Sequence, residues 1–328
     1  MTYLTDSPAA APPARFASPV DTRRHGEYRV RRDPDDPRPL YRFAGRIGGP
    51  DGAFPAEAGR YHLYSGWFCP WAQRVVIVRA LRGLQGVVSL SSVDNARDGR
   101  GWAFREATGP DPVNGFTLLR EAYEATEPGF DGHVSVPTLW DRVSGRIVSN
   151  TFGDLTIDLT TAFDRWALPG TDTYPEPLRP AIDALDERLL VDVNQGVTTA
   201  AGTGPTADAA RAVLRATLDE LDERLRGSRY LHGDSITESD VRLWVTLVRL
   251  DVAYNADGVL GPWSLADLPT LWAYARDLYQ QPAFRDSTDF STFTRPGRPV
   301  PDWDAPHDRG AAVPASVGPG TPVAGGVR

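Results

Sequence analysis

The sequence predicts an α+β N-terminal half followed by an all-α C-terminal half. Between residues 59 and 167, short β-branched stretches alternate with segments of helical period. From residue 176 to residue 290 the periodicity is helical throughout, and residues 168–180, which join the two halves, contain four prolines. A chain of 328 residues is also long enough for two domains with cores of their own.

The composition is ordinary for a globular protein and argues against several kinds of partner. Hydrophobic residues make up 41% and charged residues 24% of the chain. The net charge of −8 argues against a nucleic-acid surface, no apolar run reaches the length of a membrane span, and residues 1–19 do not resemble a signal peptide. One cysteine cannot form an internal disulfide, so we expect a cytoplasmic protein. From the net charge and the lack of a long apolar run, we expect that it binds neither nucleic acid nor a membrane.

The chain contains no lysine, since all 35 of its basic residues are arginine. This excludes Schiff-base chemistry, a phosphate-loop lysine and Ser-Lys catalysis. The histidines are scattered and, with a single cysteine, offer no spacing suited to metal ligands, so no metal site is expected. They are His25, His62, His133, His232 and His307.

The N-terminal half has the element order of a thioredoxin-like domain. It begins with residues 1–58, an irregular arm rich in Pro, Gly and Arg. The pattern then predicts a strand at 61–64, a helix at 70–84, a strand at 87–93, a short helix at 116–125, a hairpin of 134–141 and 146–149, and a helix at 150–166. In this βαβ–ββα order, which fills residues 59–167, the first two strands are parallel.

The C-terminal half is predicted to be an all-helical domain over residues 176–290. Its helices are expected at 176–194, 206–226, 237–254 and 268–280. The third has the clearest start, because Thr237 is a suitable N-cap and Asp240 follows three residues later in a variant of the capping box. Residues 291–328 are rich in Pro and Gly and are predicted to be a mobile tail.

The lone cysteine occupies an unusual position. Cys69 follows the first predicted strand and directly precedes Pro70, which is favoured in the first turn of a helix. Free N–H groups and the positive end of the helix dipole favour a thiolate at such a place. The alternative is a small buried apolar side chain, as free cysteines often are. The junction and its aromatic neighbours favour a reactive thiolate.

Five segments between about residue 54 and residue 289 carry a family resemblance. They are Arg60-Tyr61-His62-Leu63-Tyr64, Cys69-Pro70-Trp71-Ala72-Gln73-Arg74, Gly101-Trp102-Ala103-Phe104, Val136-Pro137-Thr138-Leu139-Trp140-Asp141 and Arg242-Leu243-Trp244-Val245-Thr246-Leu247-Val248-Arg249-Leu250-Asp251. With the two-domain order, they resemble the Xi class of glutathione transferases, the glutathionyl-hydroquinone reductases. This resemblance implies a glutathione transferase fold and a homodimer.

The resemblance also implies roles for residues around the cysteine. Cys69 is then the nucleophile, Pro137 is a cis proline, and Val136 offers its backbone to a thiol cosubstrate, which pairs there like an added strand. Trp102 packs against the bound thiol in such an enzyme. On the sequence alone, Trp102 is equally well explained as an aromatic side chain that pins its loop to the core.

The reaction implied by the resemblance removes a thiol from an aromatic thiol conjugate. Cys69 attacks the sulfur of an S-conjugated hydroquinone, releases the hydroquinone and becomes a mixed disulfide, while Trp67 and Phe68 line the entrance. The chain has no second cysteine to resolve that disulfide, so the second attack must come from an external small thiol. We therefore expect a ping-pong cycle with no bound cofactor.

Two departures from the family pattern concern the ligands. The family usually continues with Glu-Ser after the residue that matches Asn150, and these two hold the γ-glutamyl group of glutathione; here Thr151 and Phe152 follow. Asn150 and Thr151 remain predicted thiol-binding residues, and the altered pair indicates mycothiol, a sugar-linked cysteine, in place of glutathione. Tyr254 is the one matched phenol that can assist a leaving phenolate, unless it is only a helix-end tyrosine.

Two other classes of function remain open on the sequence. One is a different reaction on the same scaffold, carried out by a conjugating transferase, an ether-cleaving lyase or a dehalogenase. The other is a non-catalytic binding or scaffold protein that kept the fold. A conjugating enzyme usually activates its thiol with a Ser or Tyr hydroxyl, whereas Cys69 occupies that place here.

Overall fold

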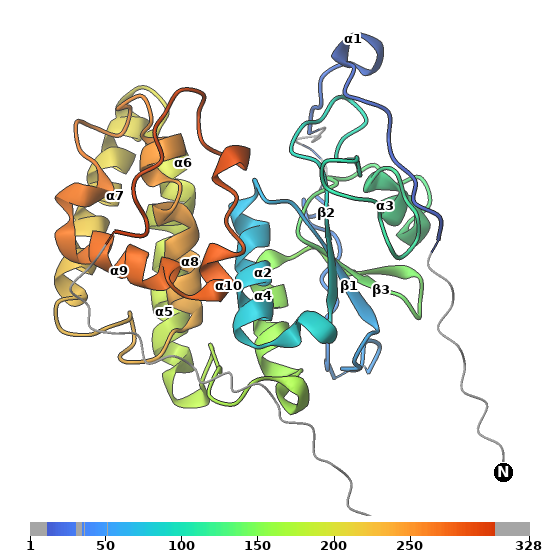
Figure 1. Ribbon diagram of the computed structural model, residues 1–328, viewed down its shortest axis with the longest axis horizontal. Coiled ribbons are helices and arrows are strands. Elements are labelled where there is room, and N and C mark those ends of the chain that lie inside the picture. Colours follow the sequence, from blue (N-terminus) through green and yellow to red (C-terminus); the bar gives the residue numbers. More distant parts are fainter. Residues whose placement is uncertain (1–11, 31–34, 36, 51, 306–328) are drawn as a thin grey trace, which may run out of the picture.

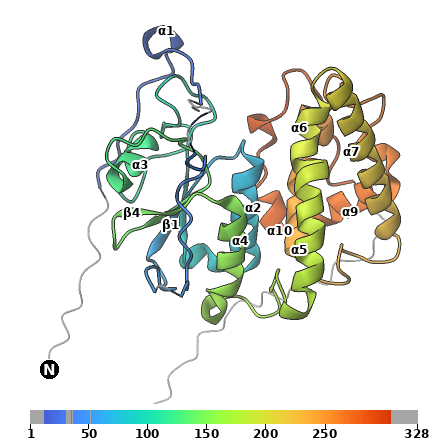
Figure 2. The same ribbon diagram turned by 180° about the vertical axis from the view of Figure 1, so that it is seen from behind.

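The computed structural model describes residues 12–30, 35, 37–50 and 52–305. Its N-terminal half is a four-stranded sheet covered by helices, and its C-terminal half is helical (Figure 1). Helices α2 (Pro70–Leu81) and α4 (Phe152–Thr161) lie between the sheet and the helical half, whereas α3 (Arg120–Thr126) covers the opposite face (Figures 1 and 2). The predicted fold class is therefore confirmed.

The sheet has the strand order β2-β1-β3-β4. The strands are β1 (Tyr61–Ser65), β2 (Ser89–Ser92), β3 (Thr138–Asp141) and β4 (Arg146–Ser149). As predicted, β1 and β2 are parallel, and β3 and β4 form an antiparallel hairpin beside β1. The hairpin turn contains Gly145 at φ +63°, a left-handed conformation that glycine adopts without strain.

The longer helices of the C-terminal half fall close to the predicted ones, and short helical segments lie between them. In the N-terminal half the remaining helical segments are α1 (Thr22–His25), η1 (Leu84–Gly86) and η2 (Asp164–Trp166). In the helical half the segments are η3 (Glu176–Leu178), α5 (Arg179–Arg188), η4 (Leu189–Gln195), α6 (Gly196–Ala200), α7 (Pro205–Arg224), α8 (Glu238–Leu247), η5 (Leu250–Tyr254), η6 (Leu265–Asp267), α9 (Pro269–Tyr279), α10 (Pro282–Arg285) and η7 (Phe290–Thr292). The π-helical segments η4 and η5 extend α5 and α8.

Two hydrophobic clusters pack against the sheet, one on each face. Successive strand residues point to opposite faces, so Leu63 joins one cluster and Tyr64 the other. The first cluster continues through α2 into the helical half, where it includes Trp244 of α8, so the two halves share one core. The second cluster contains Cys69 and Trp102, which places the cysteine where the sheet meets its covering loops.

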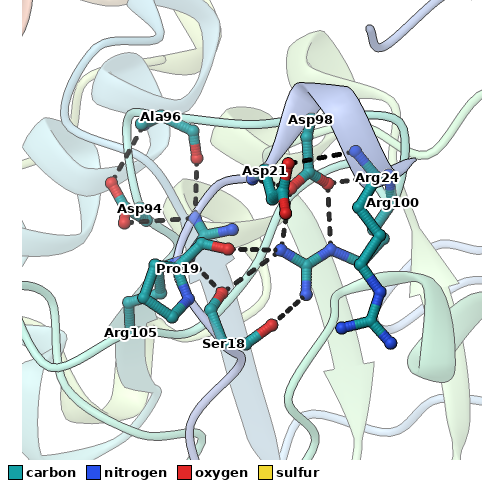
Figure 3. A network of polar contacts seen from close by, with 9 residues as sticks. All are labelled: Ser18, Pro19, Asp21, Arg24, Asp94, Ala96, Asp98, Arg100 and Arg105. Carbon is teal, nitrogen blue, oxygen red and sulfur yellow. Dashed lines mark hydrogen bonds and ion pairs between the residues drawn. The ribbon is translucent and has the colours of Figure 1, made fainter. Parts of the chain in front are cut away.

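The N-terminal arm is held against the loop that follows β2 by a network of polar contacts (Figure 3). The backbone N–H of Asp21 donates to Asp98, while Arg100 donates to Asp98 and to Ser18. Arg105 also donates to the carbonyl of Ser18. These bonds fix the described part of the arm, which the sequence predicted only as irregular.

The segment after residue 290 differs from the prediction of a mobile tail, as far as residue 305. Trp303 is buried in the core beside Trp272 and Tyr279, and its carbonyl accepts a hydrogen bond from Gln280. This packing is provided by one large aromatic side chain, which the Pro- and Gly-rich composition of the segment did not indicate. The rest of the predicted tail, 306–328, and the start of the arm, 1–11, lie outside the described residues.

The capping box at the start of α8 gives a test of stability. Asp240 is fully buried and accepts hydrogen bonds from the N–H of Leu231, from the N–H and hydroxyl of Thr237, and from Tyr274. We expect Asp240→Ala to lower the free energy of unfolding by about 2–4 kcal/mol, because several buried donors lose their acceptor.

Urea unfolding measures this loss, with Asp234→Ala in the exposed preceding loop as the matched control. The control is expected to change stability by less than about 0.5 kcal/mol. Equal effects of the two substitutions would contradict the structural role given to Asp240.

Candidate active site

Cys69 is the N-cap residue of α2, with Pro70 in the first turn, as the sequence predicted. Its backbone is extended (φ −89°, ψ 115°) because the chain is leaving the turn that follows β1. The residue is 9% exposed, and Sγ lies 3.5 Å from the carbonyl oxygen of Val136, to which the thiol donates. The cysteine is thus placed at the helix terminus but is mostly withdrawn from solvent.

The electrostatics of the thiol differ from the predicted thiolate. Burial raises the pKa of Cys69, and this effect outweighs four opposing ones, from the backbone N–H groups of Ala72 and Trp71 and from the cations of Arg249 and Arg74. The N–H groups at the helix terminus lower the pKa of Cys69, as expected. Burial raises it by more, because the sulfur lies in a hydrophobic cluster, where a charge is poorly solvated.

The loop before β3 brings a backbone edge to the cysteine. The Val136–Pro137 peptide bond is cis, as the resemblance implied. The N–H of Val136 has no hydrogen-bond partner among the described residues, and its carbonyl faces Sγ of Cys69. The preceding residue is fixed from behind, because Tyr123 donates to the carbonyl of Ser135 and accepts from its N–H. The loop therefore presents a preformed edge for an extended ligand.

Asn150 is placed differently from the prediction. Its side-chain oxygen accepts from the N–H of Phe43, its amide donates to Tyr123, and it is 1% exposed. The side chain is thus engaged in a buried network that ties the arm to the loop before β3, rather than open to a ligand. Thr151, which is half-buried, donates weakly to the carbonyl of Phe43 at 3.4 Å and so also faces the arm.

Aromatic side chains surround the start of α4. The ring of Phe152 lies 4.4 Å from that of Trp71 and meets Tyr41 of the arm edge-on at 6.4 Å. Behind them, the buried guanidinium of Arg74 lies over Trp71 and Phe152 and donates to Asn194. This side of the site is therefore apolar at its surface, and the cation beneath it is covered by rings.

Trp102 combines both readings that the sequence left open. Its ring stacks on Phe68 at 4.4 Å and shares a cluster with Cys69 and Val136, so it lies at the site. It is also covered on its outer side, since Arg97 lies 4.0 Å from its ring and Tyr28 lies 6.4 Å away. Trp102 thus pins its loop and forms part of the wall near the thiol.

The helical half contributes Arg249, which the sequence analysis missed. This buried guanidinium donates to Gln73 at 2.5 Å and to the carbonyl of Trp67 at 3.3 Å, and it lies 4.2 Å from the ring of Phe293. Burial lowers its pKa to about 10, while Tyr254 and Cys69 act in the opposite direction. The signal that could have revealed it was a cation within the apolar stretch that joins α8 to η5, residues 243–250.

Tyr254 ends η5, packs against the first hydrophobic cluster and interacts electrostatically with Cys69. Burial raises its pKa, Arg249 lowers it, and the charge of Cys69 raises it further. Trp67 is half-buried and packs at the edge of the core. The structure therefore brings Cys69, Val136, Trp102 and Tyr254 together, and adds Arg249 and the tyrosines of the arm.

The described residues include neither a metal-binding cluster nor a membrane-spanning helix. They contain no group of three or more His, Cys, Asp or Glu side chains arranged to hold a metal ion. Among the same residues, none of the helices combines the length and the apolar character that crossing a bilayer requires.

A thioredoxin-like domain with a cysteine at the start of its first helix, joined to a helical domain, defines a thiol-handling enzyme of the glutathione transferase fold. A family model described as "Glutathione S-transferase, C-terminal domain" matches residues 204–277. The chain is 42% identical to the glutathionyl-hydroquinone reductase PcpF of Sphingobium chlorophenolicum, over 68% of this chain and 73% of that protein.

Two further comparisons narrow the class. The chain is 37% identical to the glutathionyl-hydroquinone reductase YqjG of Escherichia coli, over 73% of this chain and 74% of that protein, and the glutathione-bound structure of YqjG matches with a TM-score of 0.76. A Xi-class enzyme from Natrialba magadii matches with a TM-score of 0.76 and 33% identity, over 81% of this chain and 90% of that one. The chain belongs to the Xi class of glutathione transferases, the family of the glutathionyl-hydroquinone reductases.

The position of Arg249 predicts an effect on the thiol. Removal of a buried cation near Cys69 destabilises the thiolate, so Arg249→Met is expected to raise the pKa of Cys69 further. The rate of iodoacetamide alkylation, measured against pH, reports this pKa because the thiolate is the species that reacts.

Arg249→Lys keeps the charge and is expected to recover most of the shift, whereas Arg226→Met removes an exposed arginine and is expected to leave the profile unchanged. A profile that moves equally in the Met and Lys variants would mean that Arg249 acts through packing alone.

Proposed function

We propose that the protein is a thiol-dependent reductase that removes a small thiol from S-conjugated hydroquinones or related aromatic compounds. Support comes from PcpF and YqjG, which are named glutathionyl-hydroquinone reductases. The observation that carries the proposal is the placement of Cys69, whose Sγ lies 3.5 Å from the Val136 carbonyl within an aromatic wall. We also infer a homodimer, which sedimentation would test.

In the first step the thiolate of Cys69 attacks the sulfur of the conjugate. An S–S bond forms, the bond from sulfur to the aromatic carbon breaks, and the ring carbon takes the electron pair and a proton. The sulfur is oxidised to a mixed disulfide on Cys69, and the ring is released as the hydroquinone. We assign to Tyr254 the donation of a hydrogen bond or proton to an oxygen of the departing ring, and the charge interaction between Tyr254 and Cys69 supports this assignment.

In the second step a free thiol attacks the mixed disulfide and returns Cys69 to its thiolate form. The products over both steps are the hydroquinone and the disulfide of the small thiol, so the external thiol is the reductant. Cys69 is the one cysteine of the chain, which leaves no internal thiol for this step.

We infer that the cosubstrate is mycothiol rather than glutathione. The charged γ-glutamyl group of glutathione needs polar partners, and Phe152 with Trp71 presents aromatic surface at the start of α4. The hydroxyl of Thr151 is turned to the carbonyl of Phe43. Mycothiol carries a small, uncharged acetyl group on its cysteine nitrogen, which aromatic rings accommodate without unpaired charges.

The role of the cysteine is tested by Cys69→Ser. This substitution is expected to abolish release of hydroquinone from a mycothiol conjugate, because serine cannot form the mixed disulfide. In the unsubstituted protein, intact mass spectrometry during turnover should detect one added thiol on the chain. A Cys69→Ser variant that retained full activity would overturn the mechanism.

The choice of thiol is tested by restoring the pair found in the family. Thr151→Glu with Phe152→Ser is expected to raise kcat/KM for a glutathione conjugate by about tenfold or more and to lower it for the mycothiol conjugate of the same hydroquinone, since each regained partner contributes about 1 kcal/mol.

Thr161→Glu, at the exposed end of the same helix, is the matched control and should change neither value. If the unsubstituted protein processes the glutathione conjugate faster than the mycothiol conjugate, the assignment of mycothiol is wrong.

A further inference from the structure

A cavity of about 420 Å³ lies between the N-terminal arm and the loops beside the candidate active site. Tyr28, Arg29 and Val30 of the arm form one wall, and α3 with residues 129–134 forms the other. This volume is within the range of small-molecule sites in proteins. None of the roles assigned above to Cys69, Val136 and Tyr254 uses this cavity.

The walls of the cavity are fixed by polar contacts. Arg120 of α3 donates to Glu124 and to the carbonyl of Phe130, and Glu124 accepts from the N–H of Gly129. Asp131 is paired with Arg38 at 2.8 Å and with Arg42 at 2.6 Å. The opposite wall is held by the network of Figure 3, through Arg100. The cavity is thus a built feature of the docked arm.

The backbone segment that lines the cavity continues to the residue that contacts the cysteine. His133 and Val134 line the cavity, and Val136, whose carbonyl faces Sγ of Cys69, is two residues further on. Two residues of chain span at most about 7 Å. A cysteine-containing ligand that pairs antiparallel to this segment directs its carboxyl side back over Val134 and His133.

Toward β3, on the other side of the bound cysteine, there is no comparable space for a ligand. Beyond Pro137 the chain enters β3, where Thr138 is fully buried and hydrogen-bonded to Tyr123. A bulky group on the carboxyl side of the bound cysteine therefore has its room at His133 and not at β3. This places the larger part of the cosubstrate in the cavity.

The chemistry of the lining suits a neutral, hydroxyl-rich group. Arg100 and Arg120 are engaged by Asp98 and Glu124, and Arg29 and Asp131 also line the cavity, so charges of both signs are interspersed there. The Tyr28 hydroxyl and Nδ1 of His133 are 3.1 Å apart, and Nε2 of His133 has no partner among the described residues. Mixed donors and acceptors of this kind suit the hydroxyls of a sugar.

We propose that this cavity, which we call the arm cavity, binds the sugar portion of the thiol cosubstrate. The proposal rests on the proposed function, because it assigns a second subsite to the same enzyme. It makes the N-terminal arm part of the cosubstrate site, with Tyr28 and His133 as hydrogen-bonding residues and the ion-paired walls as its frame.

The test fills the cavity from the arm. Val30 lines it and is exposed, so Val30→Trp occupies its space without disturbing a core contact. The matched control is Val20→Trp, at another exposed arm valine outside the lining. Two conjugates of one hydroquinone are compared, one with mycothiol and one with N-acetylcysteine, which lacks the sugars.

We expect Val30→Trp to raise KM for the mycothiol conjugate about tenfold relative to Val20→Trp, as the loss of one or two hydrogen bonds would do. With the N-acetylcysteine conjugate both variants should match the unsubstituted protein. The proposal is overturned if Val30→Trp affects both conjugates equally or neither.

A binding measurement separates this proposal from the proposed function. The probe is the glucosaminyl-inositol portion of mycothiol without its cysteine, observed by saturation-transfer NMR with the full chain. Binding to the unsubstituted protein and to Val20→Trp, with loss in Val30→Trp, supports the arm cavity even if no conjugate is turned over. Absence of binding, or binding that Val30→Trp leaves unchanged, overturns it whatever the outcome with Cys69→Ser.

Discussion

The buried guanidinium of Arg249 links the two halves of the protein at the point where the chemistry is expected. It donates to Gln73, one turn after the cysteine, and to the carbonyl of Trp67, just before it. A cation withdrawn from water needs compensating partners, and among the described residues no carboxylate is paired with Arg249. Its partners are neutral oxygens and the face of Phe293, so its charge stays available to an anion nearby. The shared core explains why this arrangement persists, since α2 packs on α4 and α8 together.

Local patterns made much of the fold and part of the site predictable. The βαβ–ββα order, the Thr237 cap and the position of Cys69 before Pro70 each depend on a few neighbouring residues, and such signals can be read along the chain. The contacts that were missed join residues far apart in sequence: Gln73 with Arg249, or Tyr28 with His133. No local pattern specifies them, because they form only when the halves and the arm have packed.

The charge state of Cys69 and the orientation of Asn150 also depend on tertiary structure and were not predicted. A helix terminus is a local property and was identified correctly, but the pKa of a thiol also depends on how much solvent the tertiary structure leaves around it. Asn150 was predicted to bind the thiol, yet its side-chain amide is hydrogen-bonded to Tyr123 and to the backbone of the arm. Adjacent residues specify neither the burial of Cys69 nor the hydrogen-bond partners of Asn150.

The start of α4 is aromatic, whereas the arm cavity is lined by polar groups. In the proposed function, this difference in polarity selects the cosubstrate mainly by excluding glutathione. At the start of α4, an acetyl methyl group gains about 1 kcal/mol by burial against the rings of Trp71 and Phe152. A γ-glutamyl group brings an ammonium and a carboxylate to the same rings, and each charge left without a partner costs more than that gain. Arg74 does not relieve this cost, because its guanidinium lies under both rings. If the proposed cosubstrate is correct, Thr151 and Phe152 act mainly against glutathione, since specificity is the difference between two binding free energies and the larger contribution is the penalty on the rejected ligand.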